Sequence, residues 1–154
     1  MNLAGLSLYK IPNSAPIPYE LLLLADESTN AIDKYVHDCK SHLVKYHLKT
    51  IGVCAIQEID SQTIEIKNLA IINDYQNKGI GSWCLQEIEK IYKRKYILVG
   101  TGDSSLDALR FYKRNGFEQD AIRKDYFLAN YDQAIIENGI QLRDQIVLKK
   151  TLIY

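Results

Sequence analysis

The feature that most constrains the fold is a polar, glycine-bearing stretch, Gln76-Asn77-Lys78-Gly79-Ile80-Gly81. It follows an apolar run over residues 69–72, which is typical of a buried strand, and precedes a helical pattern over residues 82–94. A strand, a tight turn and a helix start in that order place several backbone N–H groups at the positive end of a helix dipole. The stretch therefore predicts a binding site for an anion such as a phosphate.

The residue types of this turn suit that function. Gly79 and Gly81 lack a Cβ atom, so the backbone can approach a bulky phosphate closely and adopt a positive φ. Gln76 adds a side-chain amide and Lys78 adds a cation. Two other phosphate motifs fit poorly, because the Lys of a Walker loop follows its glycine and a dinucleotide fingerprint needs a third glycine where Cys84 stands. The alternative is a helix start whose glycines serve only close packing.

The spacing Gln-x-x-Gly-x-Gly resembles the pyrophosphate-binding signature of the GNAT superfamily of acyl-CoA-dependent N-acyltransferases. A later segment, Ala108-Leu109-Arg110-Phe111-Tyr112-Lys113-Arg114-Asn115-Gly116-Phe117, is similar to the second signature of that family, Ala-x-x-φ-Tyr-x-x-x-Gly-Phe, in which φ is apolar. Tyr112 stands 31 residues after Gly81, as a helix-strand-helix passage requires. Two weak motifs in the correct order make one specific resemblance, which covers residues 50–120 firmly and the termini loosely.

Patterning along the chain predicts an α/β fold with a mixed, mostly antiparallel sheet flanked by helices, as in GNAT proteins. Residues 1–18 hold all three prolines and predict an irregular lead-in. The expected elements after it are a strand at 19–25, a helix from Ser28 or Thr29 to 39, strands at 41–46, 50–59 and 63–72, the helix after the turn, a strand at 96–99, a helix at 106–114 capped by Ser104 and ended by Asn115-Gly116, a strand at 117–124, an irregular 125–137, and, after a turn at Asn138-Gly139, a last strand at 140–149.

The resemblance implies two catalytic residues. Tyr112 matches the family's tyrosine that donates a proton to the departing CoA thiolate; the alternative is a ring that packs on the sheet. Glu65, six positions before Ile71, matches a glutamate that in several members accepts a proton from the amine. The alternative there is a solvated cross-strand pair of Glu65 and Lys67, and two other carboxylates, Asp125 and Asp144, stay open as bases.

The resemblance also implies acetyl-CoA as co-substrate. Backbone groups of Leu69, Ala70 and Ile71 are expected to bind its pantetheine arm as a neighbouring strand would. Ser105 stands where the family often has an asparagine that contacts the cofactor, which weakens the expected affinity but not the reaction type. The residues expected to bind the pyrophosphate are those of the turn: Gln76, Asn77, Lys78, Gly79, Ile80, Gly81 and Ser82.

Composition limits the other functions. A length of 154 residues predicts one domain over 1–154, and 19 basic against 19 acidic residues leave no net charge to attract nucleic acid. No apolar run approaches the ~20 residues that span a bilayer. The three cysteines, Cys39, Cys54 and Cys84, suit reduced, buried thiols of a cytoplasmic protein. The three histidines recur every five residues, which fits no zinc site, so no metal is expected.

Together these observations predict an N-acetyltransferase that moves an acetyl group from acetyl-CoA to a primary amine by direct attack in a ternary complex. Cys84 is a poor covalent nucleophile, because it lies inside the helix that follows the turn. The acceptor is left open between a small amine, an aminoglycoside-like compound and a protein amine, and homodimer formation is also left open. Segments 16–26 and 137–144 resemble a subgroup of small bacterial GNAT proteins whose acceptor is not known. The rival functions are a non-catalytic acyl-CoA-sensing module and a structural scaffold.

Overall fold

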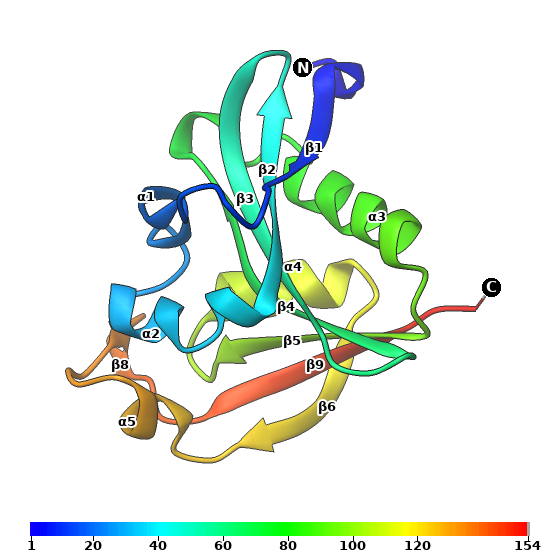
Figure 1. Cartoon of the computed structure of the whole chain (residues 1–154). Coiled ribbons are helices and arrows are strands. Elements are labelled where there is room, and N and C mark those ends of the chain that lie inside the picture. The colour runs from blue at the N-terminus through cyan, green and yellow to red at the C-terminus, as the bar shows by residue number, and fades with distance from the viewer. Residues whose placement is uncertain (154) are drawn as a thin grey trace. The chain divides into compact units, whose positions relative to one another are not determined.

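A computed structural model describes residues 1–153 (Figure 1), and contacts divide these residues into two compact units. Unit 1 comprises residues 1–58 and 66–93, and unit 2 comprises residues 59–65 and those from 94 onward. Seven strands follow the order β1-β2-β3-β4-β5-β9-β6 in one sheet, and β7 and β8 form a separate pair. The mixed sheet with flanking helices confirms the predicted fold class. A single domain over 1–154 stays a prediction, and its last residue lies outside the described part.

The elements of the two units follow in chain order. Unit 1 contains η1 (Leu3–Gly5), β1 (Leu6–Lys10), α1 (Tyr19–Leu22), α2 (Thr29–Asp33), η2 (Val36–Asp38), β2 (Cys39–Tyr46), β3 (Lys49–Glu58), most of β4 (Thr63–Ile71), η3 (Asn73–Tyr75) and α3 (Ile80–Tyr92). Unit 2 contains the start of β4, then β5 (Tyr96–Gly102), α4 (Leu106–Arg114), β6 (Glu118–Arg123), α5 (Tyr126–Asn130), β7 (Ile136–Glu137), β8 (Ile140–Gln141) and β9 (Gln145–Thr151).

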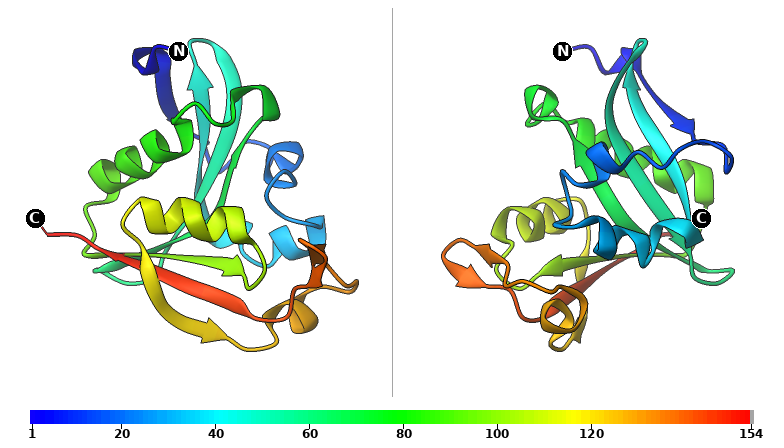
Figure 2. Two further views of the ribbon diagram at one scale, coloured as in Figure 1. Left: turned by 180° about the vertical axis from the view of Figure 1, so that it is seen from behind. Right: turned by 60° about the vertical axis from the view of Figure 1, so that its left-hand side comes forward.

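Strand β3 is buried on both faces of unit 1. Val53 and Ala55 pack against α1 and α2, whereas Ile51 packs against α3. A bulge allows this, because β2 pairs Val44 with Gly52 and then Lys45 with Thr50, which leaves Ile51 as the extra residue. Figure 2 shows α1 and α2 on one side of β2 and β3 and α3 on the other. The predicted strands at 41–46, 50–59 and 63–72 are confirmed as β2, β3 and β4.

The first 25 residues differ from the prediction. The run at 19–25 begins as helix α1 instead of a strand, and the lead-in expected to be irregular contains strand β1, which pairs antiparallel with β2. Leucine suits both helix and strand, so a short leucine run does not fix its own conformation. Leu22 is fully buried in the cluster with Val53, and this packing requires only one inward side chain per turn.

The predicted helix from Ser28 is shorter than expected. Ser28 caps α2 as predicted, because the Ala31 N–H donates to Ser28 Oγ at 3.1 Å. The α-helix ends at Asp33, and a short 3-10 helix, η2, precedes β2. The chain therefore has two helices, α1 and α2, where the sequence pattern indicated one.

Unit 2 is built on β9, which pairs antiparallel with both β5 and β6. Gly116 ends α4 with φ +93°, as predicted for a left-handed stop. Asn138 and Gly139 have φ of +52° and +75° and form the predicted turn between β7 and β8. Three details of the prediction are wrong: β5 extends to Gly102, the irregular 125–137 contains α5 and β7, and the last strand is divided into β8 and β9.

Candidate functional site

The glycine-bearing turn lies in unit 1 between η3 and α3. Asn77 and Gly79 have φ of +58° and +81°, and residues 76–79 are exposed. Gly79 is the N-cap of α3, and no side chain makes a capping hydrogen bond there. The first amides of an α-helix have no intrahelical acceptor. The turn therefore presents backbone donors at the positive end of a 13-residue helix, as its sequence predicts.

The two glycines of the turn have different surroundings. A Cβ atom placed on Gly79 would meet nothing within 4 Å, so this position needs glycine for its positive φ and for the open space in front of the turn. Gly81 lies in the first turn of α3 and is half-buried. The space in front of Gly79 is what a bulky anion would require.

Gln76 has a different contact from the predicted one. Its Nε2 donates to the Ile71 carbonyl at 2.9 Å, which ties the turn back to the end of β4. Lys78, by contrast, is exposed beside the turn. The structure thus gives the Gln76 amide a local structural contact, and its role toward a phosphate stays a prediction.

Helix α3 is fixed by its apolar face: Ile80, Cys84, Leu85 and Ile88 are buried. Burial raises the pKa of the Cys84 thiol to about 12, so the group is protonated at neutral pH. A protonated thiol is a weak nucleophile. This agrees with the expectation that Cys84 forms no covalent intermediate.

Residues 69–71 of β4 are divided between two packing environments. Ala70 is buried with Leu22 and Val53, while Leu69 and Ile71 are half-buried and pack against the cluster of Ile51 and Ile80. Leu69, Ala70 and Ile71 stay predicted ligands of the pantetheine arm.

Tyr112 lies on α4 in unit 2 and is 8% exposed. Its ring contacts those of Phe111 and Phe117, with centroids 4.9 and 5.4 Å away. The Phe117 N–H donates to the Tyr112 carbonyl at 3.0 Å, which joins the end of α4 to β6. The sequence motif thus builds an aromatic cluster that fixes the tyrosine ring, and the role of its hydroxyl as an acid stays a prediction.

Glu65 has a partner that sequence reasoning missed. Its side chain is 5% exposed, and its two oxygens accept from Nη1 and Nη2 of Arg123 at 3.0 and 2.9 Å. The hydrogen bond to Glu65 raises the pKa of the Arg123 guanidinium. The Glu65 side chain is therefore buried and paired with Arg123 instead of solvated, and Lys67 Nζ lies 5.8 Å from the centre of the Tyr35 ring. Arg123 alternates inward near the end of the predicted strand at 117–124, but nothing in that pattern names its partner.

The start of α4 is held by the β7–β8 hairpin. Ser105 Oγ donates to Glu137 Oε2 at 2.5 Å, and Ser104 Oγ donates to the Glu137 carbonyl at 3.1 Å. The predicted Ser104 cap is wrong, because Ser105 is the N-cap and makes no capping hydrogen bond with its side chain. Ser105 therefore has a carboxylate partner, and its contact with a cofactor stays a prediction.

The two other carboxylates lie on two loops, Asp125 directly before α5 and Asp144 directly before β9. Asp144 Oδ1 accepts from the Asp125 N–H at 2.8 Å, and Arg143 Nη2 donates to Asp125 Oδ1 at 3.2 Å. Asp125 is 61% exposed in its side chain. These contacts give both carboxylates an evident local structural role.

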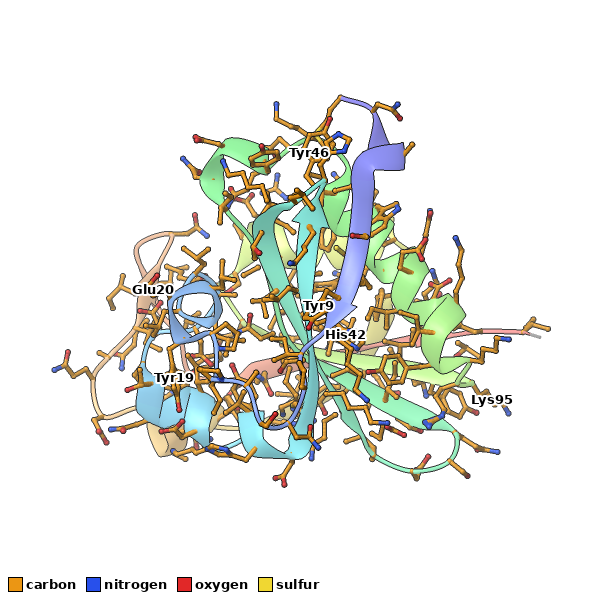
Figure 3. All side chains as sticks on the ribbon, turned by 45° about the horizontal axis from the view of Figure 1, so that its top comes forward. Tyr9, Tyr19, Glu20, His42, Tyr46 and Lys95 are labelled. Carbon is orange, nitrogen blue, oxygen red and sulfur yellow. The ribbon has the colours of Figure 1, made fainter. Side chains whose placement is uncertain are left out.

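Of the three histidines, all in the described part of the chain, only His42 is buried. It lies on β2 (Figure 3), and its Nε2 is 2.8 Å from the Tyr92 hydroxyl. Burial lowers the pKa of this ring, and nearby Lys10 and Lys40 lower it further. Within residues 1–153, no group of three or more His, Cys, Asp or Glu could hold a metal ion. In the same range, no helix has the length and apolarity needed to cross a bilayer.

Comparison with known proteins places these features in one family. The family model for the "Acetyltransferase (GNAT) domain" matches residues 38–119. An uncharacterized N-acetyltransferase of Bacillus subtilis, YvbK, is 40% identical over 133 residues, which cover 84% of this chain and 86% of the relative.

Two solved structures extend the likeness to the fold. A GNAT family acetyltransferase from Elizabethkingia anophelis with acetyl-CoA bound has a TM-score of 0.89 and 38% identity, covering 96% of this chain and 99% of the other. A Bacillus subtilis acetyltransferase in complex with CoA has a TM-score of 0.84 and 36% identity, with the same coverage. The chain therefore belongs to the GNAT acetyltransferase family, whose activity is acetyl-CoA-dependent transfer of an acetyl group to an amine.

Proposed function

We propose that the protein acetylates a primary amine by direct attack of the amine on acetyl-CoA in a ternary complex. The observation that carries this proposal is the uncapped turn before α3, where Gly79 leaves open space in front of backbone donors. Acetyl-CoA or CoA is bound in two relatives that are 38% and 36% identical to this chain. In the proposed function the amides of residues 77–82 bind the diphosphate of the co-substrate, with Gln76 and Lys78 beside them. Backbone groups of residues 69–71 bind its pantetheine arm, and Ser105 contributes a hydroxyl.

The proposed reaction has three proton transfers. The ammonium form of the acceptor first loses a proton to Glu65, directly or through a water, and the neutral amine then forms a bond to the thioester carbonyl carbon. The carbon–sulfur bond breaks as the Tyr112 hydroxyl gives its proton to the departing thiolate, and the second proton of the acylated nitrogen restores the Tyr112 hydroxyl and leaves a neutral amide. Support for Glu65 comes from its ion pair with Arg123, since an adjacent cation favours the ionised carboxylate that a base requires. Support for Tyr112 comes from its match to the second motif and from its fixed ring.

The acceptor is proposed only by class, as an uncharged or locally deprotonated primary amine of a small molecule or a protein. A cytoplasmic location follows from the same proposal, because acetyl-CoA and reduced thiols belong to that compartment. All three cysteines lie in the described part of the chain and are thiols rather than disulfides, in agreement with this proposal.

The test combines calorimetry with a thiol assay. Acetyl-CoA is titrated into the protein, and thiol release is then followed with a panel of small amines and N-terminal peptides. The proposal expects saturable binding and amine-dependent thiol release. Binding without release for any amine would support a sensing module instead, and the absence of binding would contradict the function of the turn.

A further inference from the structure

Unit 2 contains a hydrogen-bonded network of three polar side chains from three strands. Glu65 of β4 accepts two bonds from Arg123 of β6, and Arg123 Nη1 also donates to Gln145 Oε1 of β9 at 2.7 Å. Glu65 is 4% exposed and Gln145 is 9% exposed. Buried polar groups of this kind are stable only when they are hydrogen-bonded, and here they bind one another.

A glycine on the neighbouring strand makes room for this network. A Cβ atom placed on Gly100 of β5 would lie 2.3 Å from Gln145 Cδ, a distance that no side-chain carbon tolerates. The backbone of Gly100 has no need of a positive φ, so the glycine serves the close approach of the Gln145 amide. Arg123 Nη1 thus donates both to Gln145 Oε1, at 2.7 Å, and to Glu65 Oε2, at 3.0 Å.

The Arg123 guanidinium is therefore fixed by two partners, the Glu65 carboxylate and the Gln145 amide. A fork of two N–H groups on one carboxylate fixes the plane of both groups, which a lysine ammonium cannot do. Glu65 is held with its two oxygens in defined positions and with a cation at hydrogen-bonding distance. Burial by itself favours the neutral form of a carboxyl group. A cation at hydrogen-bonding distance favours the ionised form and so acts against the effect of burial.

The groups around this pair lie on α5, β4, β5 and β9. Tyr126 of α5 interacts electrostatically with Arg123, which raises the pKa of the guanidinium further. On β4, Lys67 is the next titratable side chain on the face of Glu65, and its ammonium lies over the Tyr35 ring. On β5 and β9, the neighbours Gly100 and Gln145 carry no charge. The guanidinium is the cation that the described contacts place on Glu65.

We propose that Arg123 is a positioning residue for acetyl transfer, which together with Gln145 holds the Glu65 carboxylate ionised and in a single orientation. The inference rests on the proposed function, in which Glu65 accepts the proton of the amine. It adds that the acidic limit of activity is set by Arg123, a residue 58 positions away along the chain.

The first experiment measures the charge of Glu65 without any acceptor. Protein labelled with ¹³C at glutamate carboxyl carbons is titrated by NMR, and the Glu65 signal is assigned by its loss in Glu65→Gln. We expect Arg123→Met to protonate Glu65 at a pH higher by on the order of one unit or more. Arg143→Met is the matched control, because it removes an exposed arginine from an exposed carboxylate, Asp125. An equal midpoint for Glu65 in wild type and Arg123→Met would overturn the inference.

The second experiment measures thiol release against pH with an amine that the panel identifies. Arg123→Met is expected to move the acidic limb upward by the same interval while the KM for acetyl-CoA is unchanged, and Arg123→Lys is expected to restore part of the shift. A uniform loss of kcat at every pH, with the limb unmoved, would show a structural role only and overturn the inference. If Arg123→Met does not fold by circular dichroism, Arg123→Lys serves in both experiments, with a smaller expected shift in the same direction.

Different results would contradict the base role of Glu65 and the positioning role of Arg123. A Glu65→Gln profile identical to wild type would contradict the base role and, with it, the positioning role. A Glu65→Gln variant that loses the acidic limb, combined with an unmoved limb in Arg123→Met, would retain the proposed function and overturn the inference alone.

Discussion

The turn at residues 76–82 and the Glu65–Arg123–Gln145 network differ in where their hydrogen-bonding groups find partners. In the turn, α3 begins at an exposed glycine with no side-chain cap, so backbone donors face outward. In the network, the buried Glu65 carboxylate and the buried Gln145 amide bind the half-buried Arg123 guanidinium. Unsatisfied donors at a surface cost little because water binds them, whereas buried charges must be paired. The backbone donors of the turn are thus available to a ligand. The polar groups of the network instead bind one another, which fixes the positions of their side chains.

The largest expected effect is on the turn. Gly79→Glu places a carboxylate where we propose the diphosphate binds, so the affinity for CoA should fall by on the order of 10²-fold or more, which is about 2.7 kcal/mol. Calorimetric titration with CoA measures this. Gly139→Glu is the matched control, because Gly139 also has a positive φ, +75°, and open space at its Cβ. Equal affinity in the two variants would contradict an anion site at the turn.

The next effect concerns the chemical step. Tyr112→Phe removes only the hydroxyl and retains the ring that packs on Phe111 and Phe117. We expect kcat for thiol release to fall roughly 10²-fold, as for the loss of a general acid, with CoA affinity unchanged. Tyr9→Phe, at a 49% exposed tyrosine of β1, controls for the substitution itself. An unchanged kcat in Tyr112→Phe would assign the tyrosine to packing alone.

The buried network should have a stability effect that the exposed ion pair lacks. Glu65→Gln leaves Arg123 without a counter-charge and should lower the free energy of unfolding by roughly 1–3 kcal/mol. Asp125→Asn breaks the exposed pair with Arg143 and should cost less than about 1 kcal/mol. Urea unfolding at pH 7 measures both. Glu65→Gln should also remove the acidic limb of the pH–rate profile. Equal stability losses would remove the distinction between the two pairs.

The smallest expected effect is at Cys84, beneath the turn. Because burial raises the pKa of this thiol to about 12, it stays protonated from pH 6 to 9, and its alkylation by iodoacetamide in the folded protein should be slow. Cys84→Ala should leave the rate of acetyl transfer unchanged while lowering stability by about 1 kcal/mol through lost packing. A rate that falls by an order of magnitude in fully folded Cys84→Ala, but not in Cys54→Ala, would contradict the expectation that the Cys84 sulfur takes no part in the reaction.

The sequence by itself determined the features that depend on residues close together in the chain. The glycine turn, the stop at Gly116, the Asn138-Gly139 turn and the strands β2, β3 and β4 follow from local backbone preferences and from period-two alternation. The two motifs also determined the family, because their residue types and separation are set by the backbone that carries them. These features were predicted within a few residues of their observed bounds.

Only the tertiary structure decided which distant groups meet. The leucine run at 19–25 became helix α1 because Leu22 packs against Val53, and no local pattern distinguishes that outcome from a strand. Glu65 and Arg123 are separated by 58 positions, and strand pairing brings them together. Alternation assigned Glu65 to a face, but its burial, its ionic partner and the glycine that makes room for Gln145 depend on three other strands. Long-range packing decides these contacts, because the chain must close loops of many residues before any of them can form.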